Sequence, residues 1–419
     1  MEEIDNSKRR VIIICMTIIF IIVLLFGGYY AYLIFFKKDT EELDKSDIAQ
    51  VSNYDIRIIK EINKNETKNY LISPYSIEMT LAMLRDGTSG KTREQIDNLI
   101  GNRKINILKS EGKINVANGL FINEKYKNSI LKSYYNTIQK DYDSDIIYDK
   151  LENPKVVNDW VNDETYKMIP KLFDTLSGDP LLVLVNALAI DVEWEYAFDC
   201  KDTIESKFTR DDASEINVSM MHKSYEEKAK YFKTEDAKGV IIPYQPYDKH
   251  GNKAKKGVKG LEFIGILPNT DIKNYINNLT IDEINEFDEK SHNTSDSEKL
   301  ILNLPSFSYD YEINNFILNL KNLGIENIFD VRGNFSKMTN EEVFISDAKH
   351  KTFIEVDENG TKAAAATGMV VSKNAIESSV ESITFDKPFA YIIRDQKTKE
   401  LLFFGVVYEP NKWKGSTCK

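Results

Sequence analysis

The sequence is poor in the residues from which most catalytic sites are built. Its 419 residues include only four histidines and three cysteines. It has no Gly-x-Ser-x-Gly segment to carry a hydrolase nucleophile, and no cysteine and histidine spacing resembles a zinc site. Residues 87–92 fail as a phosphate-binding loop, because Arg85 stands where that motif requires its first glycine. We therefore expect no enzymatic activity, no metal and no cofactor.

The three cysteines, Cys15, Cys200 and Cys418, are widely separated along the chain. Their spacing alone does not pair any two of them. A bridge between Cys200 and Cys418 would require an oxidising compartment. We expect both to be unpaired thiols, with the bridge as the alternative.

Composition indicates one large folded domain. Hydrophobic residues make up 42% of the chain and charged residues 29%, which allows a large core. No linker rich in proline, glycine or serine divides the sequence. The net charge of −11 argues against a general nucleic-acid surface. We expect a monomer that binds no nucleic acid.

One short segment is basic although the chain is acidic. It lies within residues 244–260 and is formed by Lys249, His250, Lys253, Lys255, Lys256 and Lys259. Such a tip is either the solvated end of a hairpin or a weak site for an anionic polymer. We favour the solvated hairpin and keep polymer binding at Lys249 to Lys259 as the alternative.

The N-terminus contains a long apolar run. Residues 11–36 include no charged side chain, and basic residues flank both ends. As a helix the run would be about 39 Å long, enough to cross a hydrocarbon core of roughly 30 Å with tilt. The basic residues slightly favour a tail at 1–10 inside the cell, a tether at 39–50 and the large domain outside. The alternative is a cleaved secretory signal and a secreted protein.

The most informative segment lies near the C-terminus, where Glu358 and Gly360 precede a run of small residues. The run is formed by Thr361, Ala363, Ala364, Ala365, Ala366 and Thr367. In an extended strand, the odd-numbered residues share a small, uncharged face and Lys362 projects from the other. Such a segment can lie outside a sheet or enter it, because nothing bulky or charged obstructs the face that becomes buried.

This segment, followed by the sequence FDKPF at 385–389, resembles the hinge and post-loop signature of inhibitory serpins. Further segments resemble that family in the same order, namely 69–88, 118–122, 185–194, 302–305 and 325–330. The resemblance covers roughly residues 50 to 412. It implies a mixed α+β serpin fold with three β-sheets, about nine helices and an exposed reactive-centre loop.

The resemblance also places the structural sites. It implies a serpin domain at 51–412, a reactive-centre loop at about 360–385 and a tail at 413–419. The residues that would form the shutter and breach of the central sheet are Ser73, Pro74, Asn186, Trp194 and His350. The helical spacing of 156–168 predicts a helix across that sheet, and the apolar run 181–190 predicts a strand buried on both faces.

The implied function is irreversible inhibition of a serine or cysteine endopeptidase. The protease would cleave the loop and form an acyl-enzyme, and the freed hinge would enter the sheet as a strand. The alternative is a non-inhibitory, membrane-tethered binding protein or chaperone, which the small hinge residues disfavour. An outer-surface location would expose the domain to its target.

The scissile bond follows from the usual serpin spacing, counted from Gly360. That count places the bond between Asn374 and Ala375, which suggests an asparaginyl-specific target. A hinge one residue shorter would place it between Lys373 and Asn374, which suggests a trypsin-like target. The sequence leaves both alternatives open, with the first preferred.

Overall fold

The computed structural model describes residues 51–415, except 104, 106, 177, 256–257, 296–297 and 362–378. Contacts divide the chain into two units, Met1–Ile48 and Ala49–Lys419. The first unit lies outside the described residues, and with it the predicted membrane span at 11–36. None of the helices that the structure describes is long and apolar enough to cross a bilayer.

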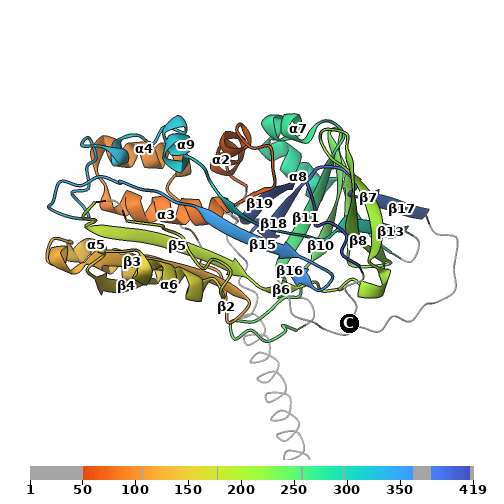
Figure 1. Ribbon diagram of the computed structural model, residues 1–419, viewed down its shortest axis with the longest axis horizontal. Coiled ribbons are helices and arrows are strands. Elements are labelled where there is room, and N and C mark those ends of the chain that lie inside the picture. The colour runs from red at the N-terminus through yellow and green to blue at the C-terminus, as the bar shows by residue number, and fades with distance from the viewer. Residues whose placement is uncertain are drawn as a thin grey trace, which may run out of the picture. The chain divides into compact units, whose positions relative to one another are not determined.

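The largest sheet of the second unit is antiparallel and has the strand order β1-β19-β18-β11-β10-β9-β12 (Figure 1). In that order its strands are Tyr70–Ile72, Leu401–Val407, Phe389–Asp395, Leu261–Pro268, Ala237–Pro243, Lys230–Lys233 and Ser291–Asn293. β19 is a continuous apolar run, as expected where both faces of a sheet are covered. The neighbouring strands β18 and β11 are mostly apolar and contribute Arg394 and Glu262, which form an ion pair at 2.7 Å. Gly405 lies opposite Tyr391, where a Cβ would come within 2.2 Å of the tyrosine ring.

A second sheet has the order β17-β13-β8-β7. Its strands are Ser379–Thr384, Glu298–Pro305, Glu215–Tyr225 and Ile204–Thr209. β17 pairs in parallel with β13 and is followed by Phe385, which is fully buried. This sheet therefore fixes the chain immediately after the segment 362–378.

The remaining strands form two hydrogen-bonded groups instead of the single central sheet that was expected. One has the order β14-β15-β16-β6, with bounds Phe307–Glu312, Lys351–Val356, Gly360–Thr361 and Val192–Glu193. The other contains β2, β3, β4 and β5, with bounds Lys109–Ser110, Ile114–Asn123, Ser144–Asp149 and Leu182–Ile190. The groups are separate because a cavity lies between β5 and the chain that leads into β15.

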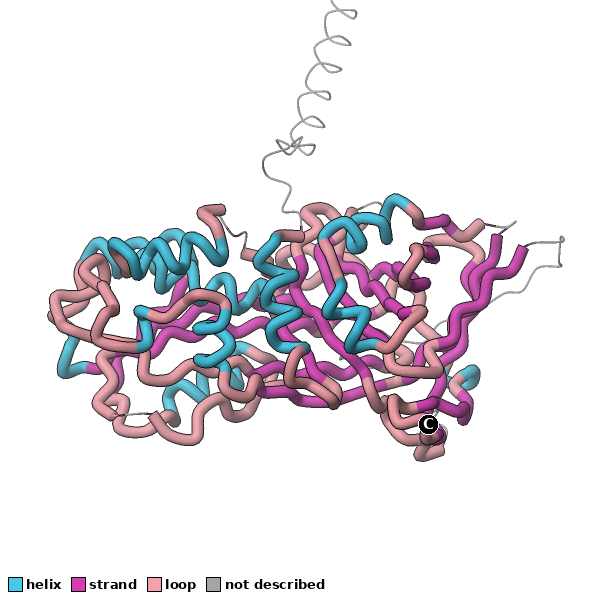
Figure 2. Tube along the Cα trace, turned by 90° about the horizontal axis from the view of Figure 1, so that it is seen from above, coloured by secondary structure: helices cyan, strands magenta, loops and turns pink. Residues whose placement is uncertain are grey.

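Eight α-helices lie among the described residues, against an expectation of about nine, and they surround the sheets (Figure 2). Their bounds, from α2 to α9, are Asn53–Asn63, Pro74–Gly87, Gly90–Ile100, Lys132–Tyr142, Lys155–Glu164, Ile272–Asn278, Ile281–Glu289 and Phe316–Asn322. α6 packs on β3 and β5 from one side, and α3 contacts β5 from the other. The mixed α+β fold is thus confirmed.

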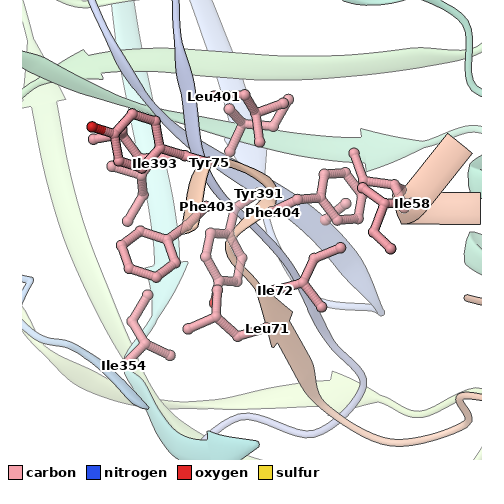
Figure 3. Packing of buried hydrophobic residues seen from close by; sticks show 14 of the residues in the cluster. Ile58, Leu71, Ile72, Tyr75, Ile354, Tyr391, Ile393, Leu401, Phe403 and Phe404 are labelled. Atoms are coloured by element: carbon pink, nitrogen blue, oxygen red, sulfur yellow. The ribbon is translucent and has the colours of Figure 1, made fainter. Parts of the chain in front are cut away.

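The main hydrophobic core joins the largest sheet to the strands around the cavity (Figure 3). Leu71 of β1, Phe403 of β19 and Ile354 of β15 line one small cavity together. The Thr352 hydroxyl donates to the Leu71 carbonyl at 2.7 Å. One edge of β15 is paired with β14 along its whole length, so the edge toward β5 is the one that borders the cavity.

Candidate functional site

The predicted hinge begins with a tight turn that returns the chain against β15. An Asp357 carboxylate oxygen accepts from the amides of Asn359 at 2.8 Å and Gly360 at 3.2 Å. The Asp357 amide in turn donates to the Gly360 carbonyl at 3.0 Å. Burial raises the pKa of the Asp357 carboxyl. The turn fixes the position at which β16 starts.

β16 is a two-residue strand that lies between β15 and β6 (Figure 1). It is antiparallel to both, with Thr361 opposite Val356 on one side and Val192 on the other. A Cβ at Gly360 would lie 2.1 Å from the Val192 carbonyl oxygen, so only glycine fits there. Thr361 is 2% exposed. The first two residues of the predicted loop are therefore inside the sheet.

Glu358 is held by the segment between β6 and β7. Its carbonyl accepts from the Phe198 amide at 2.8 Å, and its carboxylate accepts from the Thr203 hydroxyl at 2.7 Å. Between these two contacts lies the short 3₁₀ helix Cys200–Asp202. This segment thus supports Glu358, which lies two residues before the hinge strand β16.

Cys200 is disulfide-bonded. The expectation of an unpaired thiol at this position is therefore wrong, and its bonding partner lies outside the described residues. The sequence could not show this because pairing depends on distance in space and not on spacing along the chain.

Trp194 lies directly after β6 and contacts the hinge turn twice. Its amide donates to the Asn359 carbonyl at 2.8 Å, and its indole N–H donates to the Asp357 carbonyl at 2.9 Å. The indole packs between Tyr244, which it stacks on at 4.5 Å between ring centroids, and the edge of Phe263. Trp194 therefore ties the turn to the core.

Tyr244 is a residue of this site that the sequence reasoning missed. Its hydroxyl and that of Thr361 are hydrogen-bonded at 2.5 Å, and both residues are buried. Burial raises the pKa of the Tyr244 hydroxyl, which is therefore neutral. In the sequence, Tyr244 only opens the basic segment 244–260, and no local pattern connects it with a residue more than a hundred positions later.

A cavity of about 510 Å³ lies along the inner edge of β5. Residues 181–188 line one side, residues 341–352 line the other, and α3 contributes part of its wall. A small second cavity continues it between Leu188–Ile190 and Phe353–Glu355, as far as Thr361. We call these two cavities together the slot. The slot follows β5 for its whole length, and β16 lies at one end of it.

The predicted shutter residues lie along this slot. The His350 Nε2 atom accepts from the Ser73 amide at 3.1 Å. Ser73 caps α3, whose first residue is Pro74, and the Ser76 hydroxyl donates to the Asn186 side-chain oxygen. Ser73, Ser76, Asn186 and His350 all line the larger cavity. The structure thus brings these residues together across the two strand groups.

The rest of the predicted loop is only partly described. Ala363, Ala364, Ala365, Ala366, Thr367, Lys373, Asn374 and Ala375 lie outside the described residues. The ends of the range 360–385 belong to β16 and β17. The segment that could be presented to a protease is therefore narrower than the sequence suggested.

The basic tip at 249–259 is partly neutralised. The Lys253 ammonium lies 2.7 Å from a Glu193 carboxylate oxygen, and Lys113 approaches the same carboxylate at 3.8 Å. The Asp248 carboxylate accepts from the amides of His250 and Asn252, both at 2.9 Å. These contacts favour a self-contained hairpin end over a polymer site.

Burial lowers the pKa of His350 to about 3, against an ordinary value near 6.5. The unfolded chain therefore binds a proton below pH 6.5 that the folded chain does not bind, and stability falls as the pH falls through that window. By pH 5 the loss is about 2 kcal/mol. We predict that His350→Gln, which keeps an acceptor for the Ser73 amide, lacks this loss in urea unfolding.

The measurement is the difference in unfolding free energy between wild type and variant at pH 7.5 and pH 5. The variant is compared with wild type because other buried groups also change stability with pH. Burial raises the pKa of Asp55 to about 6 and of Glu78 to about 7, and these two carboxyls stabilise the fold as the pH falls. The exposed His250 provides a matched control as His250→Gln. An unchanged pH dependence in His350→Gln would contradict the buried, neutral state of this histidine.

Comparisons with known proteins agree with this geometry. Leukocyte elastase inhibitor of Xenopus laevis is 28% identical, over 84% of this chain and 96% of its own length. The native-state crystal structure of the thermophilic serpin tengpin superposes with a TM-score of 0.75 at 27% identity, over 88% of this chain and 95% of that one.

A thyroxine-binding globulin complex with thyroxine superposes with a TM-score of 0.69 at 21% identity, over 86% of this chain and 99% of that one. That likeness concerns the fold alone. The family model described as Serpin (serine protease inhibitor) matches residues 49–410. The chain therefore belongs to the serpin family.

Proposed function

We propose that this protein inhibits a serine or cysteine endopeptidase as a suicide substrate. The observation that carries the proposal is the slot beside β5, which has Thr361 at one end. The slot is only about 10 Å³ next to Thr361 and about 510 Å³ farther along, so β5 and β15 would move apart to admit a strand. Similarity to leukocyte elastase inhibitor supports the same activity. The chain itself supplies a substrate loop and a receiving sheet, and the target protease supplies the catalysis.

The first step belongs to the protease. Its serine or cysteine attacks the carbonyl carbon of the scissile bond, the C–N bond breaks, and an ester or thioester joins protease and loop. The new amino terminus leaves with a proton from the protease's general acid. The cut frees the hinge from the strand β17 that follows the loop, and the hinge can then extend β16 along the slot.

The register of β16 determines which side chains would face the core. Thr361 pairs with Val192 and Val356, and pairing continues with opposite sequence direction on both sides. Every second residue of the inserted strand would face the same side as Thr361. Extended in this register, each would have one partner on the β5 side and one on the β15 side: Ile190 and Ile354 for Ala363, Leu188 and Thr352 for Ala365, and Asn186 and His350 for Thr367. These partners line the core side of the sheet, and a small inserted side chain can pack on them.

The scissile bond remains a proposal from spacing. We place it between Asn374 and Ala375, with Lys373 and Asn374 as the alternative pair. The two choices imply different targets, an asparaginyl-specific protease or a trypsin-like one.

We also propose that residues 11–36 anchor the domain at the outer face of a membrane, with secretion after signal cleavage as the alternative.

We predict that residues 39–419 form a denaturant-resistant, one-to-one complex with at least one protease in a panel of serine and cysteine endopeptidases. The complex should persist on a denaturing gel because an acyl bond joins the two chains. Mass spectrometry of the released C-terminal peptide should give an N-terminus at Ala375, or at Asn374 for the alternative bond. If every protease digests the loop and keeps its activity, the chain is a non-inhibitory binding protein.

Two neighbouring substitutions test the direction of the hinge. Thr361→Arg places a charge on the buried face, where desolvation without a partner costs several kcal/mol. We predict that this variant is cleaved as a substrate, with a large rise in the moles of inhibitor consumed per mole of protease inactivated. Lys362→Glu, on the opposite face, serves as the control and should change that ratio little. Equal losses in both variants would show that the assignment of faces is wrong.

A further inference from the structure

Tyr244 occupies a fixed position beside the hinge strand. It follows β10 directly, and its amide donates to the Leu261 carbonyl at 3.0 Å. Its backbone forms an isolated β-bridge with Trp194, and the two rings stack at 4.5 Å with an interplanar angle of 7°. Tyr244 is 1% exposed. Backbone and ring are therefore both held, which leaves the hydroxyl at one defined point.

At this point the Tyr244 hydroxyl meets the side chain of Thr361. The two hydroxyl oxygens are 2.5 Å apart, and both residues are removed from water. A buried hydroxyl that loses its partner keeps its desolvation cost, whereas replacement of both hydroxyls by apolar groups of similar shape is nearly neutral. The bond is thus specific for a hydroxyl at position 361 when residue 244 is tyrosine.

The backbone of β16 provides only part of this specificity, through the Asp357 turn and the close approach at Gly360. β16 is only two residues long, and main-chain hydrogen bonds do not distinguish one residue from the next. A shift by one residue would turn every following side chain to the other face of the sheet. It would place Lys362 where Thr361 now lies, against Val192 and Val356 of the core. The same shift would bring Thr361 to the place of Gly360, where a Cβ lies 2.1 Å from the Val192 carbonyl oxygen, so Gly360 also disfavours that register. The hydroxyl contact adds a preference for the Thr361 side chain itself.

We propose that Tyr244 is a positioning residue that acts with Gly360 and the Asp357 turn to set the register in which the hinge enters the slot. Its hydroxyl recognises Thr361 and holds the hinge strand in the one alignment that keeps Lys362 off the core face. The biological consequence of this contact rests on the proposed function. Every residue that is inserted after Thr361 would pair in the register that Thr361 sets. The contact itself exists before any protease acts.

The test is a double-mutant cycle on the full chain. Tyr244→Phe keeps the ring that stacks on Trp194, and Thr361→Val keeps the shape of the hinge side chain. The readout is hydrogen–deuterium exchange, followed by mass spectrometry, at the Trp194 and Asp357 amides, which donate to the hinge carbonyls of Asn359 and Gly360. The Asn269 amide, which donates to the Asp236 carbonyl at 2.8 Å, reports on stability elsewhere.

Each single variant should speed exchange at the two hinge-bonded amides on the order of ten- to a hundredfold, without a change at Asn269. The double variant should be less affected than the product of the two single effects, since it leaves no hydroxyl unpaired. Thr361→Ser, which retains the hydroxyl, should remain within a few-fold of wild type. With a target protease, the single variants should also consume more inhibitor per mole of protease.

Multiplicative effects in the cycle, or unchanged exchange in Tyr244→Phe, would overturn the proposal, because Tyr244 would then act only through packing. Faster exchange in Thr361→Ser, equal to that in Thr361→Val, would also overturn it. The exchange measurement uses no protease. A failure to trap any protease would therefore contradict the proposed function alone, and the coupling between the two hydroxyls would still decide this inference.

Discussion

Two strand edges that face the same cavity constrain the rest of this structure. β5 pairs with β3 on its outer edge, and β15 pairs with β14, while a cavity of about 510 Å³ lies along the inner side of β5. Strand edges present unpaired amide and carbonyl groups that a further strand can satisfy. Under the proposed function, the fold that keeps these edges apart would be held in place by a kinetic barrier, because filling the slot would stabilise it.

Different residues around the slot hold its two ends. Trp194 and Tyr244 hold the hinge turn at one end, so that Gly360 and Thr361 are the residues from which insertion would proceed. His350 and Asn186 lie farther along, on opposite sides, and both bond to the start of α3. Under the proposed function, an inserting strand would pass between these two side chains. The part of the slot at His350 and Asn186 therefore depends on the start of α3.

Local composition predicts part of this arrangement, since the apolar run at 181–190 contains the strand β5. The small residues at 363–367 lie outside the described residues, so their burial as a strand stays a prediction. The positions of Ser73, Asn186, Trp194 and His350 are implied by the resemblance to serpins and not by local composition. The bond between Tyr244 and Thr361 could not be predicted, because it joins residues whose neighbours in sequence show no common pattern. The disulfide at Cys200 and the separation of the central sheet likewise depend on contacts between distant segments.

The central claim is that the loop fills the slot once it is cut. The most direct test is to nick the loop within 362–378 with a protease that escapes inhibition and to compare unfolding temperatures of intact and nicked protein. A new strand of about ten residues, paired on both edges, adds roughly twenty backbone hydrogen bonds worth about 1 kcal/mol each, offset in part by the entropy lost when the strand becomes ordered. The account therefore predicts an increase of more than about 10 °C in the nicked protein. An equal or lower unfolding temperature after the cut would contradict it.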